Sequence, residues 1–258
     1  MLAVVADMQR DIGGFLKTGR FSESDREGNL RFYTSRSIPH VVAAIGGFSG
    51  DEAAQSVGKL ISHFRPKFLV SAGFASSVKS CLPVGGVVVC DRISVVGGPA
   101  YSWRTSDALK IEADPLVVDR IRLEMSNSDV KFDVGGCLTL PQSVVRSPMK
   151  EWLGRTFDVA AVDLDGYRVA DAVRDARLQF ILVRAVMDTV EQDLLPRVSE
   201  TMRYPLARRI IRSSAYAIGN PVRIFEIAKS ASQAGTARKS LSWFLYRLSR
   251  TRLAMGED

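Results

Sequence analysis

Three acidic residues stand where two apolar segments of the chain end. Asp163 and Asp165 follow one apolar run, and Asp188 ends the next. Short apolar runs are typical of buried strands, and residues 167–176 between them have the apolar spacing of a helix. The pattern predicts a strand–helix–strand unit with two neighbouring parallel strands, whose carboxyl ends bring the three carboxylates together. Open α/β sheets bind their ligands at such ends.

Other kinds of reactive site have little support. The two histidines, His40 and His63, are far apart in the sequence, so neither a zinc site nor a His-based triad is indicated. The Gly-rich segments at 46–50 and 84–88 lack the spacing of a dinucleotide-binding fingerprint or of a phosphate-binding loop. We therefore expect no metal ion and no cofactor, and a chemistry that carboxyl groups carry out.

Three segments resemble motifs of the nucleoside phosphorylase and nucleosidase superfamily, in that family's order. Residues 68–91, FLVSAGFASSVKSCLPVGGVVVCD, are similar to its strand, Gly-rich turn and second strand. VDLDGYRVA (162–170) is similar to its Val-Glu-Met-Glu helix start, and VRAVMD (183–188) to its Val-Arg-x-Ile-Ser-Asp ending. The resemblance implies an α/β three-layer sandwich in which helices flank a central, mostly parallel mixed sheet.

The same resemblance implies an activity. The best-known small members of the family cleave methylthioadenosine and S-adenosylhomocysteine, so it implies an enzyme that breaks the N-glycosidic bond of a purine nucleoside, with adenine as the expected base. Such cleavage needs a proton for the departing base, support for a positively charged ribose, and a nucleophile.

Family roles can be carried over to individual positions. Asp188 matches the Asp that gives or shares a proton with N7 of the base, and a buried strand end offers the apolar surroundings that such an acid needs. Asp165 matches the second Glu of the helix-start motif, which binds ribose hydroxyls; Asp163 matches the first, and Leu164 the Met beneath the sugar. Structural alternatives are an N-cap role for Asp188 and helix capping by Asp163 or Asp165.

The nucleophile decides between hydrolysis and phosphorolysis. Asp11 stands where hydrolases of this family carry a Glu that positions water. Phosphorolysis requires a cationic, Gly-rich or Ser-rich cradle, and Phe74 replaces the Ser or Thr of the family's phosphate-binding turn. Because Arg10 could bind phosphate, that alternative stays open, but hydrolysis is favoured.

Substrate specificity rests on fewer residues. The segment 139–148 corresponds to the family's base-stacking loop; Val144 stands at an apolar position of that loop, and Gln142 either reaches the base edge or faces solvent. Phe74 and the additional C-terminal segment suggest a large or apolar 5′ substituent. Residues 219–248 resemble the hopanoid-associated branch, which removes adenine from a lipid nucleoside. A degenerate member that binds a nucleoside without turnover is the other alternative.

The composition predicts one folded domain, since 46% of the 258 residues are hydrophobic and 24% are charged. The N-terminus predicts a strand rather than a signal peptide, and no apolar run approaches the ~20 residues of a transmembrane helix. Three cysteines in apolar surroundings indicate reduced thiols. We expect a cytoplasmic homodimer, possible contact with membranes, a small nucleoside as ligand, and no nucleic acid as partner.

The net charge is concentrated at one end. Residues 199–258 hold 11 Lys and Arg against 4 Asp and Glu, which gives the +7 of the whole chain. We expect residues 1–198 to form the catalytic domain, and 199–258 to be a basic helical segment packed on it, with helices at 204–218, 222–231 and 236–253. The last helix has an apolar stripe that either packs on the sheet or docks on a second subunit or an anionic membrane. The stripe consists of Leu241, Phe244, Leu245 and Leu248.

The remaining periodicity predicts alternating strands and helices. Strands are expected at 2–6, 40–45, 68–72, 87–96, 132–140, 159–164 and 179–186, and helices at 51–64, 115–125 and 166–176. Such alternation is typical of a sheet that helices cover on both faces.

Overall fold

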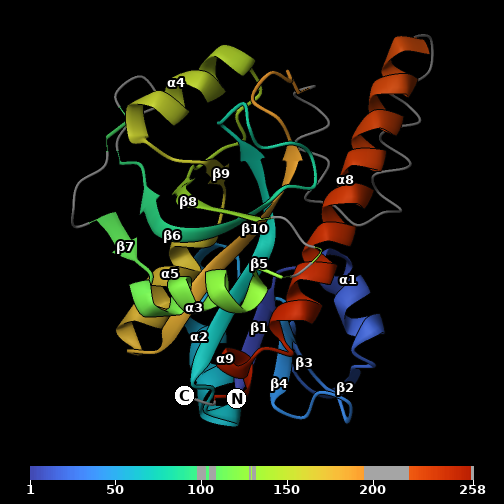
Figure 1. Ribbon diagram of the computed structural model, residues 1–258, viewed down its shortest axis with the longest axis vertical. Helices are drawn as coiled ribbons and strands as arrows, with labels where there is room; N and C mark the ends of the chain where they lie inside the picture. The colour runs from blue at the N-terminus through green and yellow to red at the C-terminus, as the bar shows by residue number, and fades with distance from the viewer. Residues whose placement is uncertain (98–102, 105–108, 128, 130–131, 195–220, 257–258) are drawn as a thin grey trace.

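The computed structural model describes residues 1–97, 103–104, 109–127, 129, 132–194 and 221–256, with the backbone alone for 221–227 (Figure 1). The expected helix at 204–218 lies outside the described residues. In the described part, no helix is long and apolar enough to cross a membrane.

One mixed sheet runs through the described residues, and ten strands form it. The strands are β1 (Leu2–Ala6), β2 (Ser22–Glu27), β3 (Leu30–Thr34), β4 (Val41–Ile45), β5 (Phe68–Ser77), β6 (Val87–Val95), β7 (Lys110–Glu112), β8 (Phe132–Thr139), β9 (Ala161–Asp163) and β10 (Gln179–Asp188). Their order is β10-β6-β8-β9-β5-β1-β4-β3-β2, and β7 pairs with β6. The strands β4, β1, β5 and β10 are mutually parallel neighbours.

Part of the sheet closes on itself. Besides β6, β10 also pairs with β5, so β5, β10, β6, β8 and β9 form a ring. Because β9 is antiparallel to β5 whereas β10 is parallel to it, β9 and β10 run in opposite directions and β5 lies between them. The expected unit of two neighbouring parallel strands at 158–188 is therefore wrong. Apolar runs report burial, but not the partner or the direction of a strand.

Helices cover both faces of the sheet, as expected (Figure 1). They are α1 (Gln9–Thr18), α2 (Ala53–Phe64) after a 3₁₀ turn (Gly50–Glu52), α3 (Pro115–Met125), α4 (Ser147–Phe157), α5 (Gly166–Asp175), α8 (Pro221–Leu248) and α9 (Arg252–Met255). Successive strand residues point to opposite faces. Leu2 and Val4 therefore pack with α1, α3 and α8, whereas Ala3 and Val5 pack with α2 and α5.

The C-terminal segment differs from its prediction in two respects. The expected helix at 236–253 is interrupted after Leu248, and α9 begins at Arg252. The expected interruption between 231 and 236 is absent, because α8 is a single helix of 28 residues that contains Gly235. Its apolar stripe, from Leu241 to Leu248, is fully buried in the main core. This burial offsets the roughly 1 kcal/mol that a helical glycine costs relative to alanine. The hairpin of β2 and β3, the strand β7, and the helices α1 and α4 have no counterpart among the predicted elements.

Candidate active site

A cavity of about 250 Å³ lies where β1, β5, β9 and β10 end. The loop after β8 and one side of α8 complete its walls. All the residues that the sequence suggested for the site line this cavity: Asp11, Phe74, Gln142, Val144, Asp163, Leu164, Asp165 and Asp188. The fold thus gathers side chains from segments far apart in the sequence into one place.

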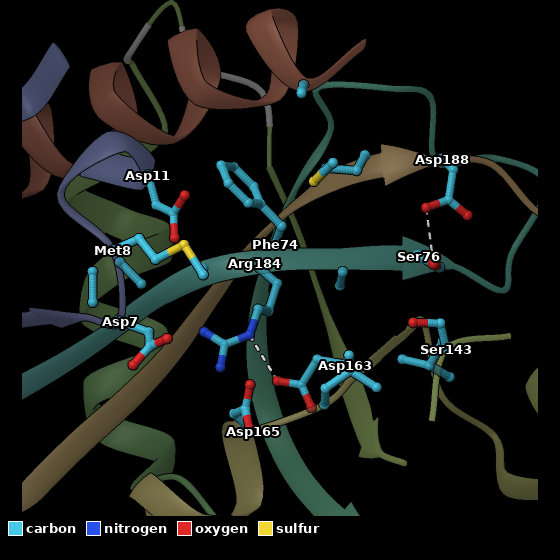
Figure 2. A pocket seen from close by; sticks show the side chains of 18 of the residues that line it. Asp7, Met8, Asp11, Phe74, Ser76, Ser143, Asp163, Asp165, Arg184 and Asp188 are labelled. Carbon is cyan, nitrogen blue, oxygen red and sulfur yellow. Dashed lines mark hydrogen bonds and ion pairs between the residues drawn. The ribbon is translucent and has the colours of Figure 1, made fainter. Parts of the chain in front are cut away.

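The two ends of the cavity differ in their side chains. Figure 2 shows Asp188 beside Ser76 at one end, and Asp11 beside Met8 at the other. Phe74 lies between them along one wall. A ligand that fills the cavity therefore meets carboxyl groups at both ends and an aromatic ring in the middle.

Asp188 is buried and held by two donors. Ser76 donates a hydrogen bond from Oγ to Oδ1 over 2.9 Å, and Lys150 donates from Nζ to Oδ2 over 2.5 Å. Burial raises the pKa of Asp188 above the usual range of an aspartate, although the Lys150 charge and both hydrogen bonds lower it. The carboxyl group therefore holds its proton more tightly than an exposed aspartate does.

Lys150 is the least expected residue of the site. Its side chain is fully buried at the start of α4, and the ammonium group also donates to the carbonyl oxygens of Thr189 (2.9 Å) and Gln192 (2.7 Å). Buried lysines are rare unless they are paired. The sequence held a weak signal for this residue, since Lys150 lies on the same helix face as the buried Leu153, three residues later.

Asp163 has its carboxylate fully engaged inside the protein. Thr139 donates to Oδ1 over 2.6 Å, and the buried Arg184 donates from Nε to Oδ2 over 2.8 Å. Arg184 also donates to the carbonyl oxygens of Ser71 and Val183. Although Asp163 lines the cavity, both of its oxygens already have partners, so its geometry is that of a residue that fixes Arg184.

Asp165 occupies the N-cap position of α5, but its side chain makes no capping hydrogen bond. Thr139 instead accepts from the backbone N–H of Tyr167, in the first turn. The helix-capping alternative is therefore wrong for Asp165, and Asp163, which precedes the cap, is bound to Arg184. Gly166, the first residue of α5, has no room for a side chain, because a Cβ there would lie 2.3 Å from Oδ2 of Asp163.

Asp11 has an unusual protonation equilibrium. Burial raises its pKa to about 6, while the positive charges of Arg10 and Arg238 partly offset the shift. The ion pair with Arg10 is loose, with 3.7 Å between Nε and Oδ1. A carboxyl group with this pKa is mostly ionised at neutral pH and can still accept a proton, which suits a general base.

Apolar side chains form much of the wall between these groups. Phe74, Leu164, Met8 and Phe48 line the cavity, and Val144 is buried beside it. Gln142 also lines the cavity, but it is largely exposed, so its two interpretations stay open. Within the described residues, no cluster of three His, Cys, Asp or Glu side chains has an arrangement that could hold a metal ion.

Helix α8 contributes a polar edge to the cavity. Ser230, Gln233 and Arg238 line it. Gln233 and Gln192 exchange two amide hydrogen bonds of 2.8 and 3.2 Å, which join α8 to the loop after β10. The sequence associated the C-terminal segment with the 5′ side of the substrate only in general terms, because the spacing of this helix does not reveal which part of the sheet it crosses.

Solved structures with the same fold include a hydrolase and several nucleosidases. A futalosine hydrolase from Helicobacter pylori matches with a TM-score of 0.68 and 14% identity over 95% of this chain and 96% of its own. An S-adenosylhomocysteine nucleosidase from Streptococcus pyogenes matches with a TM-score of 0.66 and 22% identity over 96% of both chains. The fold is thus that of the nucleosidases, as the resemblance implied.

Sequence comparison identifies the family. The model of the phosphorylase superfamily matches residues 2–203. A 5′-methylthioadenosine/S-adenosylhomocysteine nucleosidase from Listeria welshimeri is 22% identical over 205 residues, which cover 74% of this chain and 88% of the relative. The chain belongs to the phosphorylase superfamily, and the expectation of an enzyme of the nucleosidase and nucleoside phosphorylase class is confirmed.

Proposed function

We propose that this protein hydrolyses the N-glycosidic bond of a purine nucleoside, with adenine as the favoured base. The observation that carries the proposal is the placement of Asp188 and Asp11 at opposite ends of one cavity, with Asp165 also in its lining. An acid, a base and a ribose-binding carboxylate are the groups that this reaction requires.

At the base end, Asp188 gives its proton to N7 as the bond between the anomeric carbon and N9 breaks. Burial favours the protonated form of this carboxyl group, as the raised pKa indicates. The electron pair of the broken bond then stays on a base that leaves without a negative charge. Val144 supplies apolar surface beside the rings.

At the sugar end, Asp165 accepts hydrogen bonds from ribose hydroxyls, and Leu164 lies beneath the ring. The ion pair of Asp163 with Arg184 holds the start of α5 and so positions Asp165. A carboxylate near the ribose also stabilises the positive charge that develops on the sugar.

The nucleophile is a water molecule that Asp11 activates. The Asp11 carboxyl has a pKa of about 6 and is mostly ionised at neutral pH, so Asp11 can take a proton from that water molecule. Asp7 lines the same part of the cavity, and two carboxylates oppose the binding of a phosphate dianion. Phosphorolysis remains the alternative, with Arg10 as the phosphate ligand.

The 5′ side of the substrate remains a prediction. A large apolar group, such as the lipid of a hopanoid nucleoside, would meet Phe48 and Phe74, but also the polar edge of α8. Contact with an anionic membrane would have to use exposed basic residues such as Arg250 and Arg252, because the apolar stripe of α8 is buried. Cosedimentation with anionic vesicles tests that contact, and light scattering tests the homodimer.

Incubation with adenosine, methylthioadenosine and inosine, with and without phosphate, tests the function. We expect free base and free ribose, at a rate that phosphate does not change. Formation of ribose 1-phosphate would replace hydrolysis by phosphorolysis. Binding of nucleoside without release of base would identify the degenerate, non-catalytic member.

A further inference from the structure

The buried ammonium group of Lys150 has a complete set of partners. It donates to Oδ2 of Asp188 at 2.5 Å, to the Thr189 carbonyl oxygen at 2.9 Å and to the Gln192 carbonyl oxygen at 2.7 Å. A protonated lysine has three N–H donors, whereas a neutral one has only two. Three acceptors therefore match the charged form, and Lys150 is a fixed positive charge against Asp188.

The proposed reaction changes the charge of Asp188. Once the proton has moved to the base, a carboxylate remains in a site that is almost closed to solvent, and an isolated buried carboxylate is strongly unfavourable. Only a positive charge or hydrogen-bond donors can offset this. Among the described residues, the groups that act on this carboxyl are Lys150 from α4 and Ser76 from β5, and only Lys150 is charged.

We propose that Lys150 is a positioning residue for this proton transfer: its ammonium group fixes one oxygen of Asp188 and stabilises the carboxylate that remains after the proton has left. The inference rests on the proposed function and adds to it the group that makes Asp188 an effective acid. Lys150 lies in α4, and none of the three sequence motifs of the site includes that helix.

Every proton in the step is accounted for. The O–H bond of Asp188 breaks while N7–H forms, and the electron pair of the glycosidic bond goes to the base. Water bonds to the anomeric carbon, and its proton goes to Asp11. Lys150 keeps its three protons throughout. A proton from solvent returns Asp188 to the acid form, and Asp11 releases one to solvent.

A purely structural role for Lys150 predicts a different outcome. Its bonds to the carbonyl oxygens of Thr189 and Gln192 also hold the loop after β10, so loss of the side chain could disturb the site through that loop alone. Lys150→Gln separates the two roles, because an amide can still donate to those carbonyls but carries no charge. Lys150→Met, which fills similar volume without charge or donors, is the second variant.

The test compares wild type, both variants and Lys59→Gln, which removes a lysine from an exposed ion pair with Glu27. Infrared difference spectra follow the titration of the Asp188 carboxyl, which is assigned by its loss in Asp188→Asn. Loss of an adjacent positive charge should raise the titration midpoint by about 1 to 3 pH units in Lys150→Gln and Lys150→Met. Lys59→Gln should leave it unchanged.

Steady-state kinetics give the second readout. Because Asp188 becomes a weaker acid without Lys150, the alkaline limb of the kcat profile should move to higher pH, and the maximal kcat should fall by roughly tenfold or more. Circular dichroism checks that each variant is folded. If Lys150→Gln is unfolded, Lys150→Met alone is compared with the wild type.

Three outcomes distinguish the proposed role of Lys150 from a purely structural role and from a failure of the proposed function. An unshifted titration in a folded variant overturns the role of Lys150, even if Asp188→Asn is inactive and the proposed function stands. A lower rate with unmoved pH limbs also overturns it and leaves the loop contact as the explanation. Absence of base release by the wild type would instead remove the proposed function, while the titration, which needs no turnover, would still decide whether Lys150 controls the charge of Asp188.

Discussion

Arg184 of β10 and Asp163 of β9 form a buried ion pair of 2.8 Å between two strands that are not paired with each other. Both side chains are almost inaccessible to solvent. The pair therefore ties the start of α5 to β10 across β5, which lies between the two strands. Thr139 also donates a hydrogen bond to Asp163, and Arg184 donates one to the Ser71 carbonyl oxygen.

Removal of one partner of this ion pair should destabilise the protein. Arg184→Met leaves the Asp163 carboxylate buried without its counter-charge, so we expect the free energy of unfolding to fall by roughly 3 to 5 kcal/mol. Urea denaturation measures it. Arg168→Gln is the matched control, because its ion pair with Asp51 is exposed, and it should change the free energy by less than about 1 kcal/mol. Equal losses in the free energy of unfolding for Arg184→Met and Arg168→Gln would contradict a stabilising role for the buried ion pair.

Gly166 should not tolerate even one additional carbon. A Cβ at this position would lie 2.3 Å from Oδ2 of Asp163 and 3.0 Å from a guanidinium nitrogen of Arg184. Gly166→Ala should therefore destabilise the protein by roughly 1 to 3 kcal/mol. Gly235→Ala in α8 meets no atom within 4 Å and should stabilise it by roughly 0.5 to 1 kcal/mol. Thermal melts of both variants test this difference in sign.

Asp188→Asn should separate binding from catalysis. Asparagine keeps the shape and can still accept from Ser76, but it has no proton to give, so turnover should fall on the order of 10²-fold or more. Binding of the free base should survive, which equilibrium titration measures. An unchanged rate in Asp188→Asn would show that another residue is the acid.

Asp11→Asn should make the protein more stable and less active at pH 7. The pKa of this carboxyl is about 6 in the folded chain against 3.8 as its reference value. The folded state therefore binds the proton more tightly, so the group favours folding most at low pH and loses that contribution as the pH rises through 6. Asparagine removes the charge, and the gain at pH 7 should be roughly 2 to 3 kcal/mol. Stability measured at pH 4 should show a much smaller difference.

Arg238→Met should change the pH dependence of the same group. The Arg238 charge lowers the pKa of Asp11, so its loss raises that pKa further. If Asp11 is the base, the acid limb of the kcat profile then moves to higher pH, because more of the enzyme carries a protonated, inactive Asp11. Arg252→Met, an exposed residue in α9, is the control. An unmoved limb would argue that another group accepts the proton from water.

The sequence by itself determined which segments are buried and which acids we propose for the chemistry. Apolar runs located β1, β4 and β6 nearly to the residue, and α3 begins at Pro115 and ends at Met125 as predicted. These features are local, because burial and helical spacing are properties of a short stretch of chain. The resemblance to the family, rather than any local pattern, implied that Asp11, Asp165 and Asp188 share one site.

Only the tertiary structure decided how these pieces meet. The direction of β9, the closure of the strand ring and the passage of α8 beside the cavity depend on pairings between segments far apart in the sequence. Lys150 reaches Asp188 across 38 positions of sequence, and only a fold that buries both makes them partners. A pattern of side chains states what must be buried, whereas the choice of partner depends on the free energy of the whole packed chain.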